Sequence, residues 1–158
     1  TFIMIAGSYI SRRHDHNHSD DLHDHDHGIM ELSAAAFDKT VDHDPHVWVV
    51  KFYSKMCGSC QAFQPAFEEA AKQVEGLHWA AVSIDEKENI ALAKKLGVLT
   101  EGIPNVKLIN AADAPLPIVT GDTPDASAVV AKLKETLQSA GATKDGEGFY
   151  KSYARSEL

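Results

Sequence analysis

The chain has 158 residues, an apolar fraction of 44% and a formal net charge of −8. A chain of this length and composition forms about one globular domain with a hydrophobic core. The negative net charge argues against a nucleic-acid surface, because phosphate backbones are bound by basic patches. No apolar run reaches the roughly 18–20 residues that span a bilayer, so we expect no transmembrane segment and no membrane partner.

Residues 1–28 lack the pattern of a folded domain. The apolar stretch 1–10 is followed by Arg12 and Arg13, which reverses the charge order of a secretory signal. Residues 14–27 contain six histidines and five aspartates, a low-complexity composition for which we expect disorder. Imidazole and carboxylate groups suit Zn²⁺, Cu²⁺ or Ni²⁺, so this tract either binds such ions loosely or is a solvated, tag-like linker.

We expect one ordered domain over residues 29–140, followed by a weakly patterned C-terminal tail over 141–158. Apolar runs, helical spacing and turn residues predict its elements. In chain order these are an edge strand at 29–32, a helix to about 41 capped by Ser33, a strand at 46–53, a helix from about 58 to 75, a strand at 77–85, a short helix around 91–96, a strand at 105–109, a hairpin turn at 110–115, its returning strand at 116–120, and a last helix with Thr123 as N-cap and Pro124 at its first position. This order predicts an α/β fold whose mixed central sheet is flanked by helices on both faces.

The two cysteines, Cys57 and Cys60, lie between the predicted strand at 46–53 and the helix that follows it. At a helix N-terminus, backbone N–H groups and the macrodipole favour a thiolate. A thiolate with a second thiol three residues away suits thiol–disulfide exchange, in which Cys57 attacks and Cys60 resolves the mixed disulfide. Two alternatives stay open: a zinc site, although four ligands are usual and no second pair exists, or a structural disulfide, which would close a very short loop.

The residues around this pair resemble the thioredoxin superfamily and, more narrowly, a single catalytic domain of the protein disulfide isomerase type. The matching segments are 49–65, 84–85, 96–98 and 102–104, within a region of about 29–140. The resemblance implies a thioredoxin fold with a helix-kinking proline at Pro65 and a cis-proline at Pro104. It also implies that Ile103 and Pro104 form a docking edge for an extended substrate segment, with Met56 beside them, and that neither a cofactor nor a metal is needed.

The sequence departs from the family at positions that modulate the active site. Lys51 stands where the family has a buried acid that assists proton transfer from the resolving thiol. A buried ammonium is unfavourable, so its pKa should fall or its head should reach solvent or a carboxylate. A neutral amine could accept the Cys60 proton, a charged one could stabilise the Cys60 thiolate, and a lysine that merely reaches the surface would do neither. Gly58 and Ser59 between the cysteines favour a reduction potential between about −270 and −180 mV.

The sequence therefore predicts a monomeric dithiol–disulfide oxidoreductase of the isomerase kind, acting on protein substrates that carry thiols or disulfides. The last residues, 155–158, read Arg-Ser-Glu-Leu and resemble a Lys-Asp-Glu-Leu retention signal with serine for aspartate. We accordingly expect the endoplasmic reticulum lumen or the secretory pathway. The alternative is a non-enzymatic thioredoxin-fold module, metal-binding or chaperone-like, in which the histidine-rich tract is the active part. The physiological direction of exchange is left open.

Overall fold

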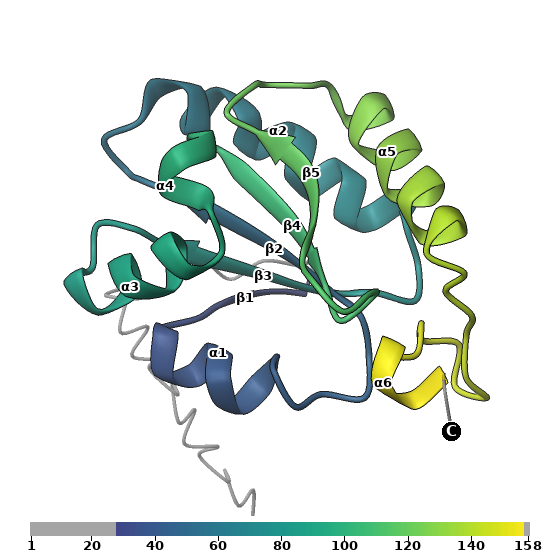
Figure 1. Cartoon of the computed structure of the whole chain (residues 1–158). Coiled ribbons are helices and arrows are strands. Elements are labelled where there is room, and N and C mark those ends of the chain that lie inside the picture. The colour runs from purple at the N-terminus through teal and green to yellow at the C-terminus, as the bar shows by residue number, and fades with distance from the viewer. Residues whose placement is uncertain (1–27, 157–158) are drawn as a thin grey trace, which may run out of the picture.

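The fold is built on a five-stranded mixed sheet in the order β1-β3-β2-β4-β5 (Figure 1). Its strands are β1 (Ile29–Glu31), β2 (Trp48–Tyr53), β3 (His78–Ser83), β4 (Asn105–Ile109) and β5 (Leu116–Thr120). β1 and β2 pair in parallel with β3, whereas β4 runs antiparallel to both β2 and β5. The computed structural model describes residues 28–156, so the expectations for 1–27 and for 157–158 lie outside the described residues.

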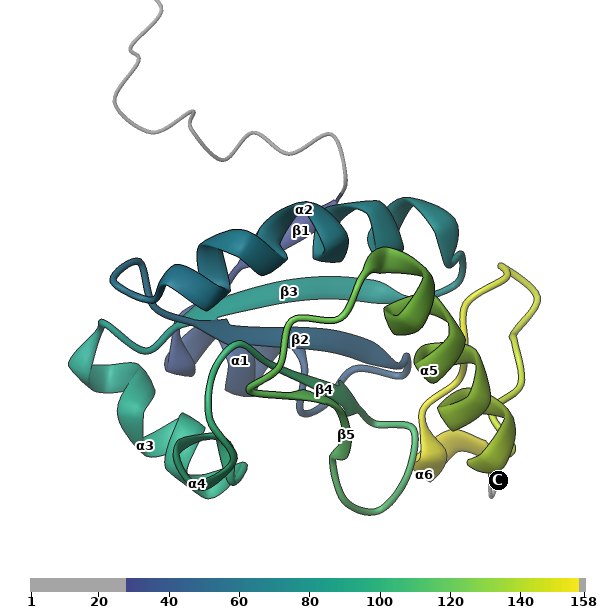
Figure 2. The same ribbon diagram turned by 90° about the horizontal axis from the view of Figure 1, so that it is seen from above.

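Helices cover both faces of this sheet, as the sequence predicted. They are α1 (Ala34–Thr40), α2 (Gly58–Gln73), α3 (Lys87–Lys95), α4 (Val98–Glu101), α5 (Ala126–Ser139) and α6 (Tyr153–Ser156). α2 and α5 lie in front of the sheet and α1 behind it in Figure 2. Each face has its own core: α2 and α5 pack on one face, and α1, α3 and α4 contribute to the core on the other. Among the described residues, no helix combines the length and apolarity needed to cross a membrane.

Side chains of β2 alternate between these two cores. Val49 belongs to the core under α2, and Val50 belongs to the core on the opposite face. Since successive side chains of a strand point to opposite faces, Lys51 projects to the same face as Val49, toward α2. The position of this lysine beneath α2 is therefore a consequence of strand register.

Two helix starts show how caps set the boundaries. Ser33 caps α1 as predicted, and its side chain accepts a hydrogen bond from the Ala36 N–H at 3.2 Å. The prediction for the last helix was wrong by two residues, because Asp125 rather than Thr123 is the N-cap of α5. The Asp125 carboxylate accepts a hydrogen bond from the Ala128 N–H at 2.8 Å, and its negative charge suits the helix N-terminus.

The chain beyond α5 returns to the sheet instead of leaving it. The Val47 N–H donates to the Tyr150 carbonyl at 3.0 Å, and the Tyr150 N–H donates to the Gly76 carbonyl at 2.9 Å. Gly76 has φ +87, and a Cβ there would lie 2.7 Å from the Gly148 carbonyl oxygen, so only glycine fits this junction. The segment from residue 141 to 156 thus packs on the end of the sheet where β2 begins, whereas its sequence pattern predicted a separate tail.

Candidate active site

The cysteines lie where β2 ends and α2 begins. Cys57 is the N-cap residue of α2, and its Sγ accepts a hydrogen bond from the Cys60 N–H at 3.1 Å. Both cysteines are free thiols in the structure; Cys57 is partly exposed, whereas Cys60 is only 3% exposed. The strand, the connecting loop and the helix therefore present one thiol to solvent and hold the other inside.

The two thiols differ in acidity for physical reasons. Partial burial raises the pKa of Cys57, but hydrogen bonds from the Cys60 side chain and backbone and from Ser59 outweigh it, so the Cys57 pKa lies below its ordinary value. Burial and the hydrogen bond given to Cys57 together raise the pKa of Cys60. Cys57 is thus the more acidic and more accessible thiol of the pair, and Cys60 is the less acidic and buried one.

Asp85 holds the loop that leads to Cys57. Its carboxylate accepts hydrogen bonds from the Ser54 hydroxyl at 2.5 Å and from the Lys55 N–H at 2.8 Å. These hydrogen bonds lower the pKa of Asp85, which keeps the carboxylate ionised and accepting. The Cys57 N–H in turn donates to the Ser54 carbonyl at 3.2 Å. The sequence marked Asp85 only as part of a family match, and its anchoring of this loop is visible only in the structure.

Lys51 is buried beneath the cysteines rather than at the surface. Its side chain is only 2% exposed, and its ammonium lies 4.8 Å from the centre of the Phe67 ring. Burial lowers the pKa of Lys51 to about 8, while the negative charges of Glu31, Glu68 and the Cys60 thiolate act in the opposite direction. An amine with this pKa is mostly protonated at pH 7 but exchanges its proton far more readily than an ordinary lysine.

A polar line along α2, which the sequence reasoning missed, faces this lysine. Gln64 accepts a hydrogen bond from the Lys51 ammonium and donates one to the Glu68 carboxylate at 2.8 Å. A cavity of about 350 Å³ is lined by these three residues together with Cys60 and Glu31. The signal was present in the spacing, since Cys60, Gln64 and Glu68 follow one another at intervals of four residues and so share one helix face.

Ile103 and Pro104, the predicted docking residues, lie at the same end of the sheet as the cysteines. The peptide bond between Ile103 and Pro104 is cis. Pro104 directly precedes β4, whose first residue Asn105 pairs with Phe52 near the end of β2. Ile103 and Pro104 therefore lie at the end of the sheet where β2 leads into α2.

The other residues of the predicted site surround Cys57. Met56 is 91% exposed beside it, and Gly58 and Ser59 are exposed in the first turn of α2. The Ser59 hydroxyl lies 3.9 Å from the Cys57 Sγ, where it supports the thiolate. Cys57 is thus accessible to solvent from this side.

A dithiol at the N-terminus of the helix that follows a central strand, on a sheet of this topology, defines a thioredoxin-fold protein. The family model described as thioredoxin matches residues 28–135. The chain belongs to the thioredoxin family.

Curated relatives narrow this relationship. The chain is 35% identical over 86 residues to protein disulfide-isomerase MPD1 of Saccharomyces cerevisiae, which covers 54% of this chain and 26% of that protein. It is 29% identical over 121 residues to human protein disulfide-isomerase A6, covering 75% of this chain and 26% of that protein. The matched region spans only about a quarter of the length of each of these relatives.

Solved structures agree with this relationship. The Trx4 domain of ERdj5 aligns with a TM-score of 0.58 at 26% identity, covering 71% of this chain and 97% of that domain. The J-Trx1 fragment of ERdj5 aligns with a TM-score of 0.58 at 27% identity, covering 70% of this chain and 52% of that fragment. This chain is therefore a thioredoxin-fold protein related to oxidoreductases of the disulfide isomerase family.

Proposed function

We propose that this chain catalyses thiol–disulfide exchange in protein substrates, as a disulfide isomerase-like oxidoreductase. The observation that carries the proposal is the asymmetry of the pair: a partly exposed Cys57 with a lowered pKa next to a buried Cys60 with a raised pKa. This difference suits the two chemical roles of the pair. One thiol must attack the substrate disulfide at neutral pH, and the other must stay protonated until it resolves the mixed disulfide.

In the reductive direction the Cys57 thiolate attacks one sulfur of a substrate disulfide and forms a mixed disulfide. The other substrate sulfur leaves as a thiolate and takes up a proton. Cys60 then loses its proton, and its thiolate attacks the Cys57 sulfur. A second substrate thiolate is released and Cys57–Cys60 becomes a disulfide, so two electrons pass from the enzyme to the substrate. The reverse sequence oxidises a substrate dithiol, and release after the first step followed by re-attack isomerises disulfides.

Lys51 is the group we assign to the resolving step. Its ammonium and Cys60 line the same cavity and influence each other's pKa. A positive charge there favours the Cys60 thiolate at the moment it must form, and the neutral fraction of the amine can accept its proton. Gln64 holds the amine in place, and Glu68 holds Gln64. Lysine would thus replace the acid that the family usually has at this position.

The substrate side of the proposal rests on Ile103, Pro104 and Met56, which lie at the same end of the sheet as the cysteines or directly beside them. An extended substrate segment that pairs with the backbone at Ile103 would bring its disulfide to Cys57.

The chemistry uses protein thiols alone and needs no cofactor. We further propose a monomer that works in the endoplasmic reticulum lumen, the compartment in which disulfide isomerases act on proteins that are acquiring disulfides.

Insulin reduction by dithiothreitol, followed as turbidity, tests the catalytic proposal. The wild-type chain should accelerate precipitation, and Cys57→Ser should not exceed the uncatalysed rate. Cys60→Ser should bind substrate covalently but release it slowly, because the resolving thiol is missing. Refolding of a scrambled disulfide protein then separates isomerisation from simple reduction. Full activity in Cys57→Ser, or loss of activity on addition of a metal chelator, would favour the metal-binding alternative instead.

A further inference from the structure

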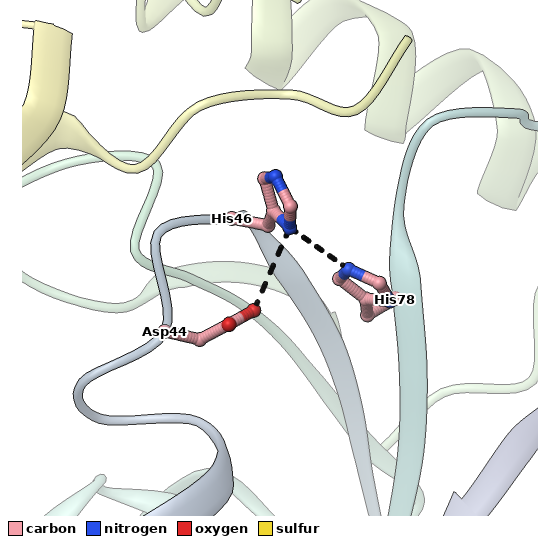
Figure 3. Close-up of side chains that lie close together, drawn as sticks. All are labelled: Asp44, His46 and His78. Carbon is pink, nitrogen blue, oxygen red and sulfur yellow. Dashed lines mark hydrogen bonds and ion pairs between the residues drawn. The ribbon is translucent and has the colours of Figure 1, made fainter. Parts of the chain in front are cut away.

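Two histidines and a carboxylate meet at the end of the sheet opposite to the cysteines. His46 Nδ1 lies 3.1 Å from His78 Nε2, and Asp44 Oδ2 lies 3.9 Å from the same His46 nitrogen (Figure 3). All three potential ligand atoms lie within 4.8 Å of one another. The strand register brings these residues together, because His78 at the start of β3 pairs with Trp48 at the start of β2, two residues after His46.

Neighbouring groups fix how these side chains face each other. His46 Nε2 lies 2.7 Å from a carboxylate oxygen of Asp145, so this nitrogen carries the proton and donates it. In the neutral imidazole the lone pair is then on Nδ1, the nitrogen that faces His78 and Asp44. A carboxylate that receives the outer N–H of a histidine is the usual support of a metal-binding imidazole. Asp145 comes from the C-terminal segment, 99 residues from His46.

Further contacts restrict the movement of all three groups. The Trp48 indole N–H donates to Asp44 Oδ2 at 2.6 Å. The Phe149 ring stacks on His78, with centroids 4.6 Å apart and an interplanar angle of 9°, and also on His46 at 5.0 Å. The cluster is half-buried and is assembled from three parts of the chain.

We propose that Asp44, His46 and His78 form a binding site for a divalent ion of the zinc class, with Asp145 as the residue that orients His46. An ion about 2.0–2.1 Å from each ligand at tetrahedral angles holds the ligand atoms ~3.3 Å apart. The separations of 3.1 and 3.9 Å bracket this value, and all three ligand atoms lie within 4.8 Å of one another, so the side chains must draw together around the ion. Both facing nitrogens must offer lone pairs to the ion, so the hydrogen that His78 Nε2 shares with His46 Nδ1 moves to His78 Nδ1 on binding. Two imidazoles and one carboxylate leave the fourth tetrahedral position to water, as in zinc sites that have three protein ligands.

The ion would join parts of the chain that are distant in sequence. It would link the turn before β2 to the start of β3 and, through Asp145, to the C-terminal segment. This role is independent of the dithiol chemistry, because the cysteines follow the other end of β2. Figure 2 shows the C-terminal segment and the entry to α2 at opposite ends of the molecule.

Thermal unfolding with and without zinc sulfate tests the site in the full-length chain, with Cys57 and Cys60 both changed to serine so that thiolates do not compete. Only a site assembled by folding binds the folded chain selectively and raises Tm. Ligands that are neighbours in sequence, as in the tract at 14–27, need no folding to reach one ion, so we expect zinc bound there to leave Tm unchanged. Zinc at about a hundred times its Kd should raise Tm by roughly 5–10 °C.

Variants assign the effect to residues. His78→Gln should abolish the rise in Tm, whereas His43→Gln, which changes an exposed histidine three residues before His46, should keep it. Asp145→Asn should weaken zinc affinity about 10–100-fold, as removal of an orienting carboxylate does. Should His78→Gln fail to fold, Asp44→Asn replaces it. No rise in the parent chain, or an equal rise after His78→Gln or Asp44→Asn, would show that the cluster is only a hydrogen-bonded cap of the sheet.

Discussion

Replacing Lys51 by methionine separates the function of this lysine from its effect on stability. Methionine has a similar length and fills the same space, but it carries no charge and no hydrogen-bond donor. The lysine is 2% exposed and its pKa is lowered to about 8 from an ordinary 10.5. The substitution therefore removes an unfavourable buried charge from the folded chain and, at the same time, a positive charge from the cavity that Cys60 lines.

The lowered pKa of Lys51 gives the expected change in the free energy of unfolding. A lowering from 10.5 to about 8 corresponds to about 3 kcal/mol of destabilisation while the amine is charged in both states. Leaving the Gln64 oxygen without its donor costs about 1–2 kcal/mol, so Lys51→Met should stabilise the fold by about 1–2 kcal/mol at pH 7. Between pH 8 and 10.5 the unfolded wild-type chain binds more protons than the folded one, so wild-type stability should rise with pH there. The variant should lack this rise.

The same substitution should slow the resolving step of thiol–disulfide exchange, although it stabilises the fold. A positive charge nearby lowers the pKa of a thiol by about 1 unit or more, so its loss should reduce the Cys60 thiolate fraction about tenfold. A more basic thiolate is roughly threefold more nucleophilic, which leaves the resolving step about threefold slower. Stopped-flow quenching of the mixed disulfide measures this step, and urea unfolding measures the stability.

A buried lysine on the opposite face of the sheet supplies the control. Lys107 is also 2% exposed, but it pairs with Val50 across the strands and forms an ion pair with Glu101. Lys107→Met should leave the resolving step unchanged. An unchanged rate and pH profile in Lys51→Met would refute the role of Lys51 in proton loss from Cys60, whatever the stability does.

Three further outcomes follow from the same geometry. Iodoacetamide should alkylate Cys57 with a midpoint below the ~8.5 of a free thiol, since its pKa is lowered; a midpoint at or above that value would remove the basis for an activated nucleophile. Cys60→Ser should accumulate a mixed disulfide on Cys57, seen by mass spectrometry of the acid-quenched reaction, whereas rapid turnover without it would contradict the resolving role. Phe67→Ala should reduce the free energy of unfolding by about 3–5 kcal/mol, because this fully buried ring fills the core under α2; urea titration measures the loss, and a change under 1 kcal/mol would disprove that packing.

The sequence by itself determined the features that depend on neighbouring residues. Apolar runs and turn residues placed β4 and β5 at the residues where the structure has them. The order of strand, cysteine pair and amphipathic helix predicted that Cys57 would stand at a helix N-terminus, because caps and helical periodicity are local signals. The residues of the cysteine motif and the prolines around it were enough to indicate the family.

Only the tertiary structure decided which side chains face one another. Lys51 meets Gln64 because β2 and α2 pack with a particular register, and a single strand pattern does not specify that register. The segment 141–156 has no periodic pattern, since backbone hydrogen bonds to distant residues order it rather than an apolar face of its own. His46 and Asp145 are in contact for the same reason, across 99 residues of chain. Local preferences select the elements, whereas long-range packing selects their neighbours, and both candidate sites depend on those neighbours.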